Sequence, residues 1–189
     1  MNADDRRELV LDAATRAFGR TGYAGTTTDT IAKEAQVSQP YVVRIFGTKL
    51  DLFLEVFERC TARVHQAFSD VLADGAFDPD DDADWERLGI AYTALIVQDR
   101  SALGVMMHGF AAGGDERIGA AARTRMAQIF DLVLSTGATD EQAREFVAQG
   151  MLLNIMLAMN APEHLHESTA IERMSTCAFG EVLELIPHE

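Results

Sequence analysis

The sequence predicts an all-α protein of about nine helices, with a small three-helix domain at the N-terminus and a larger helical domain after it. Apolar side chains recur every three or four residues through most of the 189-residue chain, which is the period of an amphipathic helix. No stretch shows the sustained alternation of apolar and polar residues that a strand requires. Glycine and proline stand where one helical pattern stops and the next begins.

The first helix is expected over residues 5–20, where four apolar residues recur at helical spacing and Gly22 follows as a stop. These four are Leu9, Ala13, Ala17 and Phe18. A second helix of about two turns is expected to begin at Thr27 or Thr28, because threonine is a good helix cap. Its buried face would consist of Ile31, Ala32 and Ala35.

A tight turn is expected at Gln36 and Val37, followed by a third short helix. Ser38 can cap this helix, Pro40 fits its first turn and Gly47 breaks it. Its inward side would carry Val42, Ile45 and Phe46. Two short helices joined by a short turn form a helix-turn-helix.

A long fourth helix is expected over residues 48–73, long enough to join two domains. The segment 74–84 contains Gly75, Pro79 and six aspartates, which indicates an exposed loop. Calcium binding is the alternative, but the spacing lacks the glycine and terminal glutamate of an EF-hand loop. Further helices are expected over residues 84–98, 101–112, 115–136, 140–160 and 168–186, separated by Gly113-Gly114, Gly137 and Pro162.

The composition is that of a folded chain, with 48% hydrophobic and 24% charged residues. The N-terminal residues lack the apolar core of a signal peptide, and the strongest apolar run, residues 150–159, is too short to span a bilayer. Cys60 and Cys177 lie far apart, with no histidine or cysteine at the spacing of metal ligands. We therefore expect a cytoplasmic protein with no membrane segment, no metal site and no cofactor.

The formal charge of −14 is distributed unevenly. Residues 1–50 carry seven Lys/Arg and six Asp/Glu, whereas residues 51–189 carry nine and twenty-four, so that the two parts have net charges of +1 and −15. No acidic residue occurs from Ala35 to Leu50, a stretch that retains Arg44 and Lys49. A nucleic-acid site needs a surface that does not repel phosphate, so it is expected in this stretch.

Residues 26–53 read TTTDTIAKEAQVSQPYVVRIFGTKLDLF. In this order they resemble the signature of TetR-family regulators: a threonine-rich helix start, an Ile-Ala-x-x-Ala helix, a Val-Ser turn and a Phe-x-x-Lys-x-x-Leu exit. The resemblance covers about residues 8–53, and the remaining chain is similar only in length and helical character. It implies an all-α homodimer that binds operator DNA and acts as a ligand-controlled repressor.

The outer face of the third helix has side chains that can recognise bases, independently of the resemblance. Arginine can form a bidentate pair with guanine, glutamine can pair with adenine, and tyrosine can bond a phosphate or pack on a thymine methyl group. Threonines and lysine at helix starts can bind phosphate. The predicted DNA-binding residues are Thr27, Thr28, Ser38, Gln39, Pro40, Tyr41, Arg44, Thr48 and Lys49.

Two positions in this helix depart from the family pattern. Many relatives carry a phosphate-binding tyrosine where this chain has Val43, and Tyr41 comes two residues earlier. Arg44 stands where a histidine is common. The roles of Tyr41, Val43 and Arg44 are therefore less firmly implied by the resemblance than those of Thr28 and Lys49.

Seven of the eight methionines lie beyond residue 100, near aromatic residues, and such side chains can line an adaptable apolar cavity. Ordinary core is the alternative for each of them. His108 and Asn154 are polar residues within apolar helical runs and could orient a small apolar or amphipathic effector. The predicted ligand-binding residues are Phe68, Tyr92, Met106, Met107, His108, Phe110, Met126, Phe130, Met151 and Asn154.

The eighth helix is apolar on nearly every side over residues 150–159, so one monomer cannot easily cover it. A second copy is the simplest partner, with Gly150 allowing close approach and the ninth helix completing a four-helix interface. The ninth helix would contribute Ile171, Met174, Ala178, Val182 and Leu185. Such a homodimer carries two reading helices, which suit a palindromic operator.

These features assign residues 1–50 to a helix-turn-helix DNA-binding domain and residues 51–189 to a ligand-binding and dimerisation domain. A ligand seated among helices four to eight would tilt the fourth helix, change the separation of the two third helices and weaken DNA binding. One alternative is a helical-bundle enzyme, but the sequence has no nucleotide-binding glycine loop, no Glu-x-x-His motif and no activated nucleophile, although five histidines occur at 65, 108, 164, 166 and 188. Another is a protein-binding adaptor, which would leave the acid-free third helix unexplained.

Overall fold

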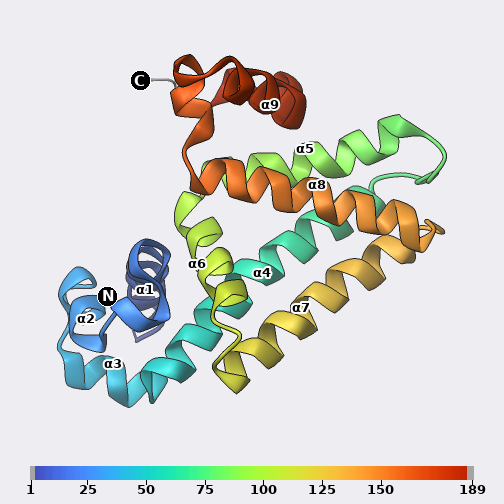
Figure 1. Ribbon diagram of the computed structural model, residues 1–189. Helices are drawn as coiled ribbons and strands as arrows, with labels where there is room; N and C mark the ends of the chain where they lie inside the picture. Colours follow the sequence, from blue (N-terminus) through green and yellow to red (C-terminus); the bar gives the residue numbers. More distant parts are fainter. Residues whose placement is uncertain (1–2, 187–189) are drawn as a thin grey trace. The chain divides into compact units, whose positions relative to one another are not determined.

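The computed structural model describes residues 3–186, apart from the side chains of Glu181 and Leu185, and every regular element in this range is a helix (Figure 1). The expected all-α fold is confirmed. The α-helices are α1 Ala3–Gly25, α2 Thr28–Glu34, α3 Gln39–Phe46, α4 Lys49–Ala73, α5 Asp82–Gln98, α6 Arg100–Ala111, α7 Glu116–Leu134, α8 Asp140–Ala158 and α9 Thr169–Phe179. Two 3-10 helices, η1 Ala161–Glu167 and η2 Gly180–Leu185, follow α8 and α9. His188 lies outside the described residues.

The chain divides into two compact units. The first comprises residues through Ala62 together with Ser101–Arg125, and the second comprises Arg63–Arg100 together with the chain from Met126 onward. Helix α6 therefore belongs to the same unit as the helix-turn-helix, which the sequence did not indicate. Among the described residues, no helix is both long and apolar enough to cross a membrane.

In the first unit, α1 is longer than expected but breaks where a stop was expected. The helix runs to Gly25, yet Gly22 has φ 69° and ψ −178°, a conformation that an L side chain rarely adopts. The buried Thr26 fixes this break, because its Oγ1 lies 2.8 Å from the carbonyl oxygen of Gly22 and 3.2 Å from that of Ala17. The end of α1 is thus locked by backbone geometry and by a threonine hydroxyl.

Helices α1 and α6 cross with their backbones in contact. A Cβ atom at Gly104 of α6 would lie 2.5 Å from the carbonyl oxygen of Gly19 in α1, and a Cβ atom at Gly19 would lie 2.5 Å from that of Ser101. Both distances are shorter than any real Cβ contact, so only glycine fits at either position. One turn along α6, the ring of His108 packs against Gly22. These contacts join α6 to α1 within the first unit.

The helix-turn-helix has the local signals expected of it. Thr27 is the cap of α2, with its Oγ1 accepting a hydrogen bond of 3.1 Å from the amide of Thr30. The turn places Gln36 at φ 56°, and Ser38 occupies the cap position of α3 without a side-chain bond. Gly47 ends α3 with φ 77°. The boundaries of α2 and α3 therefore follow from the threonine, serine and glycine signals in the sequence.

The inward side of α3 differs from the expectation at one residue. Val42 and Phe46 are buried, as expected from their spacing of four, but Ile45 is 41% exposed. The prediction that Ile45 faces inward is therefore wrong for this chain. The helix is only eight residues long, and two apolar side chains one turn apart are enough to dock it.

Helices α1 and α2 are tied by Glu34, which accepts hydrogen bonds of 2.7 Å from Arg16 Nε and 2.6 Å from Arg20 Nη2. The bond from Arg20 is the main cause of a lowered pKa of the Glu34 carboxyl, and Arg16 contributes to it. A carboxyl whose pKa is lower in the folded chain than in the unfolded chain stabilises the fold. For Glu34 this stabilisation is complete above the ordinary pKa of 4.5, and it is lost as the pH falls through the lower pKa of the folded chain.

The Glu34→Gln variant should therefore unfold more easily than the natural chain at neutral pH, by about 0.5–1 kcal/mol, because the pair is at the surface. The difference should shrink as the pH falls below the ordinary pKa of glutamate, since the natural carboxyl is then protonated as well. Thermal unfolding from pH 7 down to acid, followed by circular dichroism, measures it. A difference that is constant over this range would show that the ion pairs with Arg16 and Arg20 do not contribute.

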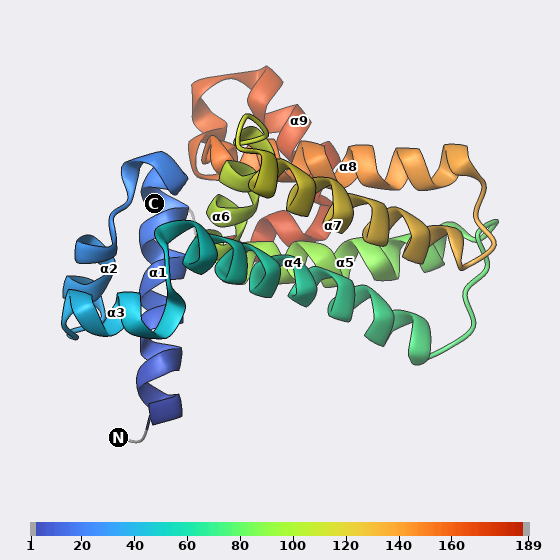
Figure 2. The same ribbon diagram turned by 90° about the horizontal axis from the view of Figure 1, so that it is seen from below.

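In the second unit, α5 and α8 lie side by side, as both views show (Figure 2). Helix α8 begins with a capping box in which Thr139 Oγ1 accepts from the amide of Gln142, and the Gln142 side chain accepts from the amide of Thr139. Both helices contribute to the core of this unit, with Leu88, Ile96, Leu153, Met156 and Leu157 buried. The helix expected over residues 168–186 is divided at Gly180 into α9 and η2, because Gly180 has φ 54°.

Candidate nucleic-acid interface and effector site

The outer face of α3 carries five side chains that contribute little to the protein core. Val42 and Phe46 hold the helix, whereas Pro40, Val43, Arg44 and Ile45 are exposed and Tyr41 is half-buried. Pro40 and Arg44 lie one turn apart and point away from the buried side. The structure therefore places the predicted reading residues Pro40, Tyr41 and Arg44 on one accessible surface.

Arg44 is the basic residue of this face, and its charge is not neutralised. Its guanidinium carbon lies 5.4 Å from the centre of the Tyr41 ring, and Arg6 of α1 approaches the same ring at 5.8 Å. Arg7, Arg16, Arg20 and Lys33 are each paired with a carboxylate. Within residues 3–186, no carboxylate pairs with Arg44. Its donors remain available to a base edge, while stacking on Tyr41 limits its motion.

The N-terminus of α2 lies next to the start of α3. Thr28 Oγ1 accepts a hydrogen bond of 3.2 Å from Gln39 Nε2, which ties together two of the predicted DNA-binding residues. Thr27 and Ser38 are exposed. These residues can offer hydroxyl and amide groups to a phosphate, but the side chain of Gln39 is already engaged with Thr28.

At the start of α4, the polar groups of Thr48 and Lys49 already bond to other groups of the protein. Lys49 Nζ donates to the carbonyl oxygen of Tyr23 at 2.8 Å and lies 4.3 Å from the centre of that ring. Thr48 donates both its amide and its hydroxyl to Asp51 Oδ2, at 3.1 and 2.7 Å. These bonds, aided by Arg117, lower the pKa of Asp51 to about 2. Phosphate contacts by Thr48 and Lys49 stay predictions, because a phosphate would share these groups with Asp51 and Tyr23.

Arg6 is a candidate that the sequence analysis did not select. It precedes the matched motif by several residues, and its place beside Tyr41 depends on how α1 packs against α3. Nothing local in the sequence indicates that contact. A basic residue in the first turn of α1 is the only available signal.

In the second unit, an aromatic cluster surrounds one buried polar pair. Phe68 of α4 lies 5.8 Å from the ring of Tyr92 and 5.3 Å from that of Phe146. Tyr92 Oη donates to Asn154 Oδ1 at 2.6 Å, and Asn154 Nδ2 approaches Met151 Sδ at 3.7 Å. Burial raises the pKa of Tyr92 to about 12 despite the bond to Asn154, so the phenol stays protonated at neutral pH.

Replacing Tyr92 by phenylalanine should destabilise the chain by about 1–3 kcal/mol, because the carbonyl oxygen of Asn154 would be buried without a donor. The double variant Tyr92→Phe with Asn154→Leu should lose less than the sum of the two single changes, since no polar atom of the pair is then left unbonded. Thermal unfolding of the four proteins tests this. Additive losses would mean that the hydrogen bond has little energetic weight.

The ten predicted ligand-binding residues fall in both units. Phe68, Tyr92, Met151 and Asn154 come together in the second unit, and Phe130 packs there in a neighbouring cluster around Val133. Met126 is the last of the predicted ligand-binding residues that belong to the second unit. Met106, Met107, His108 and Phe110 lie on α6 in the first unit, where Phe110 packs edge-on against Phe57 at 5.9 Å. The set as a whole stays a prediction.

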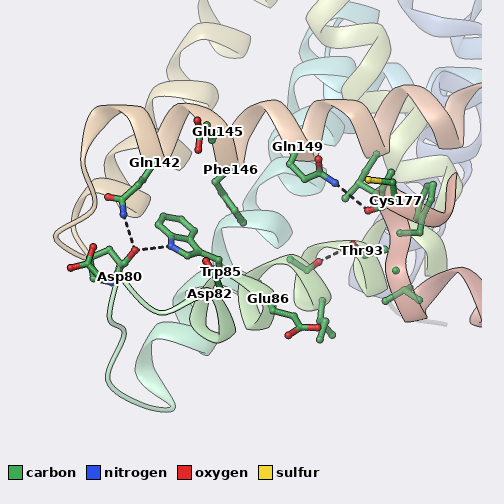
Figure 3. Close-up of a pocket in the computed structure, with 18 of the residues that line it drawn as sticks. Asp80, Asp82, Trp85, Glu86, Thr93, Gln142, Glu145, Phe146, Gln149 and Cys177 are labelled. Atoms are coloured by element: carbon green, nitrogen blue, oxygen red, sulfur yellow. Dashed lines mark hydrogen bonds between the residues drawn. The ribbon is translucent and has the colours of Figure 1, made fainter. Parts of the chain in front are cut away.

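A groove of about 1260 Å³ lies within the second unit, between α5, α8 and the α9–η2 segment (Figure 3). Trp85 and Phe146 line it together with Gln149, Cys177 and Phe179. Five carboxylates also line it, and no basic residue does. None of the ten predicted ligand-binding residues lies in this groove. No local pattern in the sequence predicts this groove, because its walls come from separate helical segments with mixed polar and apolar residues.

Helix α8 is covered on one side only. Leu153, Met156 and Leu157 are buried within the second unit, whereas Ile155 is 47% and Met159 53% exposed. Met174 of α9 is also exposed. The side chain of Leu185, which was expected to contribute to the same interface, lies outside the described residues. Exposed apolar side chains on α8 and α9 are consistent with a surface that a second copy covers.

Comparisons with known proteins match the segment that contains the helix-turn-helix. The family described as "Bacterial regulatory proteins, tetR family" matches residues 10–56. The chain is 37% identical over 75 residues to the uncharacterized HTH-type transcriptional regulator YhgD of Bacillus subtilis strain 168, covering 40% of this chain and 37% of YhgD. It is 41% identical over 56 residues to the HTH-type transcriptional activator FasR of Mycolicibacterium smegmatis, covering 30% of this chain and 26% of FasR. The matches thus span well under half of these relatives.

The likeness extends further in structure than in sequence. A TetR-like transcriptional regulator from Rhodococcus sp. RHA1 has a TM-score of 0.70 with this chain, covering 94% of this chain and 96% of that one at 18% identity. At this identity the likeness concerns the fold alone. It extends the similarity from the helix-turn-helix to the later helices.

Proposed function

Since the chain belongs to the TetR family of helix-turn-helix transcriptional regulators, we propose that it is a repressor that binds a palindromic operator as a homodimer and leaves it when a small molecule binds. The observation that carries this proposal is the outer face of α3, where Arg44 is exposed beside Tyr41 and pairs with no carboxylate in residues 3–186. Its family consists of transcriptional regulators, so the helical-bundle enzyme considered from the sequence is set aside.

We propose that residues 1–50 form the DNA-binding domain and that α3 enters the major groove. Arg44 would form a bidentate pair with guanine, and Pro40 and Tyr41 would contact neighbouring base edges or phosphate. Thr27, Thr28 and Ser38 would hold the phosphate backbone at the two helix starts. The absence of acidic residues from 35 to 50 supports this orientation, because no carboxylate of that stretch repels the phosphates.

We propose that the homodimer forms through α8 and α9. The exposed Ile155, Met159 and Met174 support this surface, since large apolar side chains are costly to leave in water. Two copies related by a twofold axis would present two α3 helices to half-sites about one turn of DNA apart. A palindromic operator follows from this symmetry.

We propose that residues 51–189 contain the effector site, and that a small apolar or amphipathic molecule enters the aromatic cluster of the second unit. Tyr92 and Asn154 support this assignment, because they form a buried hydrogen-bonded pair beside Phe68. Residues of α4 belong to both units, so a shift of this helix would change the separation of the two α3 helices. A coupling of about 1–3 kcal/mol would suffice for a usable switch.

A selection of randomised duplex DNA on the purified protein tests the DNA-binding part. An enriched palindrome that is bound less tightly as salt rises would support it. No enrichment at low salt, with protein shown to be folded and dimeric, would favour the adaptor hypothesis instead. A reporter gene behind the selected operator then separates repression from activation, and loss of the complex on adding candidate apolar ligands tests effector release.

A further inference from the structure

We infer that Val43 contacts the methyl group of a thymine next to the base pair that Arg44 reads. This inference rests on the proposed operator binding and adds a specificity-determining residue to it. Val43 is 42% exposed, although the neighbouring Val42 is buried and holds the helix in place. The fold therefore does not need an apolar side chain at position 43.

A single exposed valine is ordinary on a protein surface, so its exposure alone carries nothing. Its position on α3 is what matters. Successive residues of a helix are rotated by about 100°, which places Val43 about 60° from Pro40 and about 100° from Arg44 around the axis. Tyr41 and Ile45, one turn apart, lie on the opposite flank, where Arg6 approaches the Tyr41 ring. Val43 thus borders the reading surface on the side away from Tyr41.

Valine limits what this position can recognise. It has no donor or acceptor, so it can recognise only an apolar group. In the major groove, the C5-methyl group of thymine is the apolar feature that a base pair displays. The β-branched side chain is also stiff at χ1, so its methyl groups stay close to one position. A valine beside a guanine-reading arginine therefore favours a thymine within one base pair of that guanine.

The test removes a single methyl group from DNA. Each thymine of the selected operator is replaced in turn by deoxyuridine, which keeps every base-pairing group, and the dissociation constant is measured by fluorescence anisotropy. At one thymine in each half-site, the replacement should weaken binding. The affinity should fall about fourfold when one half-site is changed and about fifteenfold when both are changed. The Val43→Ala variant should bind more weakly and should no longer distinguish thymine from deoxyuridine at that position.

Ile45→Ala is the matched control, because Ile45 is equally exposed on the same helix but lies on the opposite flank. This variant should keep the sensitivity at the thymine assigned to Val43. Three results would overturn this inference but leave the proposed operator binding intact. The sensitivity to the thymine methyl group could persist in Val43→Ala, could disappear in Ile45→Ala, or could be absent from the natural protein while the operator is still bound. Failure to bind any duplex would overturn the proposed function with it. Unchanged circular dichroism melting shows that both variants are folded.

Discussion

The Arg44→Ala variant should lose about 10²- to 10⁴-fold in affinity for the selected palindrome while its thermal unfolding stays unchanged. A bidentate arginine–guanine pair is worth about 1–3 kcal/mol, and a homodimer would lose two of them. Arg44 is exposed and forms no ion pair within residues 3–186, so its removal leaves no carboxylate without a partner. The loss should concern the specific site far more than random DNA.

Two variants separate base reading from simple loss of charge. Arg44→Lys keeps the charge but not the planar guanidinium that forms a bidentate pair. Its affinity for the palindrome should therefore be close to that of Arg44→Ala. Lys33→Ala removes a charge from α2, where Lys33 is paired with Asp29 at 2.7 Å, and it should lower binding little and equally for all sequences. Anisotropy titrations at two salt concentrations measure all three. Equal losses for Arg44→Ala and Lys33→Ala would contradict a reading role for Arg44.

Substitution of Gly104 by alanine should destabilise the chain by about 1–3 kcal/mol, although alanine is the better helix former. The added Cβ would lie 2.5 Å from the carbonyl oxygen of Gly19, which is backbone and cannot rotate away. Helices α1 and α6 would have to move apart at their point of closest approach. The chain would lose packing around the contact between α6 and α1.

Gly89→Ala is the matched control, since Gly89 lies inside α5 and a Cβ atom there would meet nothing within 4 Å. This change should stabilise the chain by about 0.5–1 kcal/mol, because alanine restricts the unfolded chain and favours the helix. If the α1–α6 contact is as close as described, thermal unfolding should show a lower stability for Gly104→Ala and a higher stability for Gly89→Ala than for the natural chain. Stabilisation by both would mean that the two helices are not in backbone contact.

The helix-turn-helix could be predicted from the sequence because its determinants are local. Thr27, Ser38 and Gly47 mark the helix limits by their own backbone preferences, and a spacing of four sets Val42 and Phe46 inward. Ile45 was misplaced for a related reason. A helical pattern gives the angle of a side chain around the helix, but not how wide an arc the neighbouring helices cover.

Features that depend on distant segments could not be predicted in the same way. Gly19 and Gly104 are 85 positions apart, and neither looks unusual within its own helix. The groove beside Trp85 and the position of Arg6 next to Tyr41 depend equally on how separate helices pack. For the effector site, methionine and aromatic residues indicated apolar surroundings, but such residues also form ordinary core. The sequence therefore predicted which residue types line the second unit rather than which of them meet.

On α3, the residues that hold the helix in the fold differ from those that face outward, and this separation affects how such a protein can change in evolution. Two buried side chains, Val42 and Phe46, dock the helix, and the residues that would touch DNA take almost no part in the core. Substitutions at the outer positions should then alter the set of controlled genes without a cost in foldability. A lineage with this architecture can acquire a new regulon by changing a few codons of one short helix.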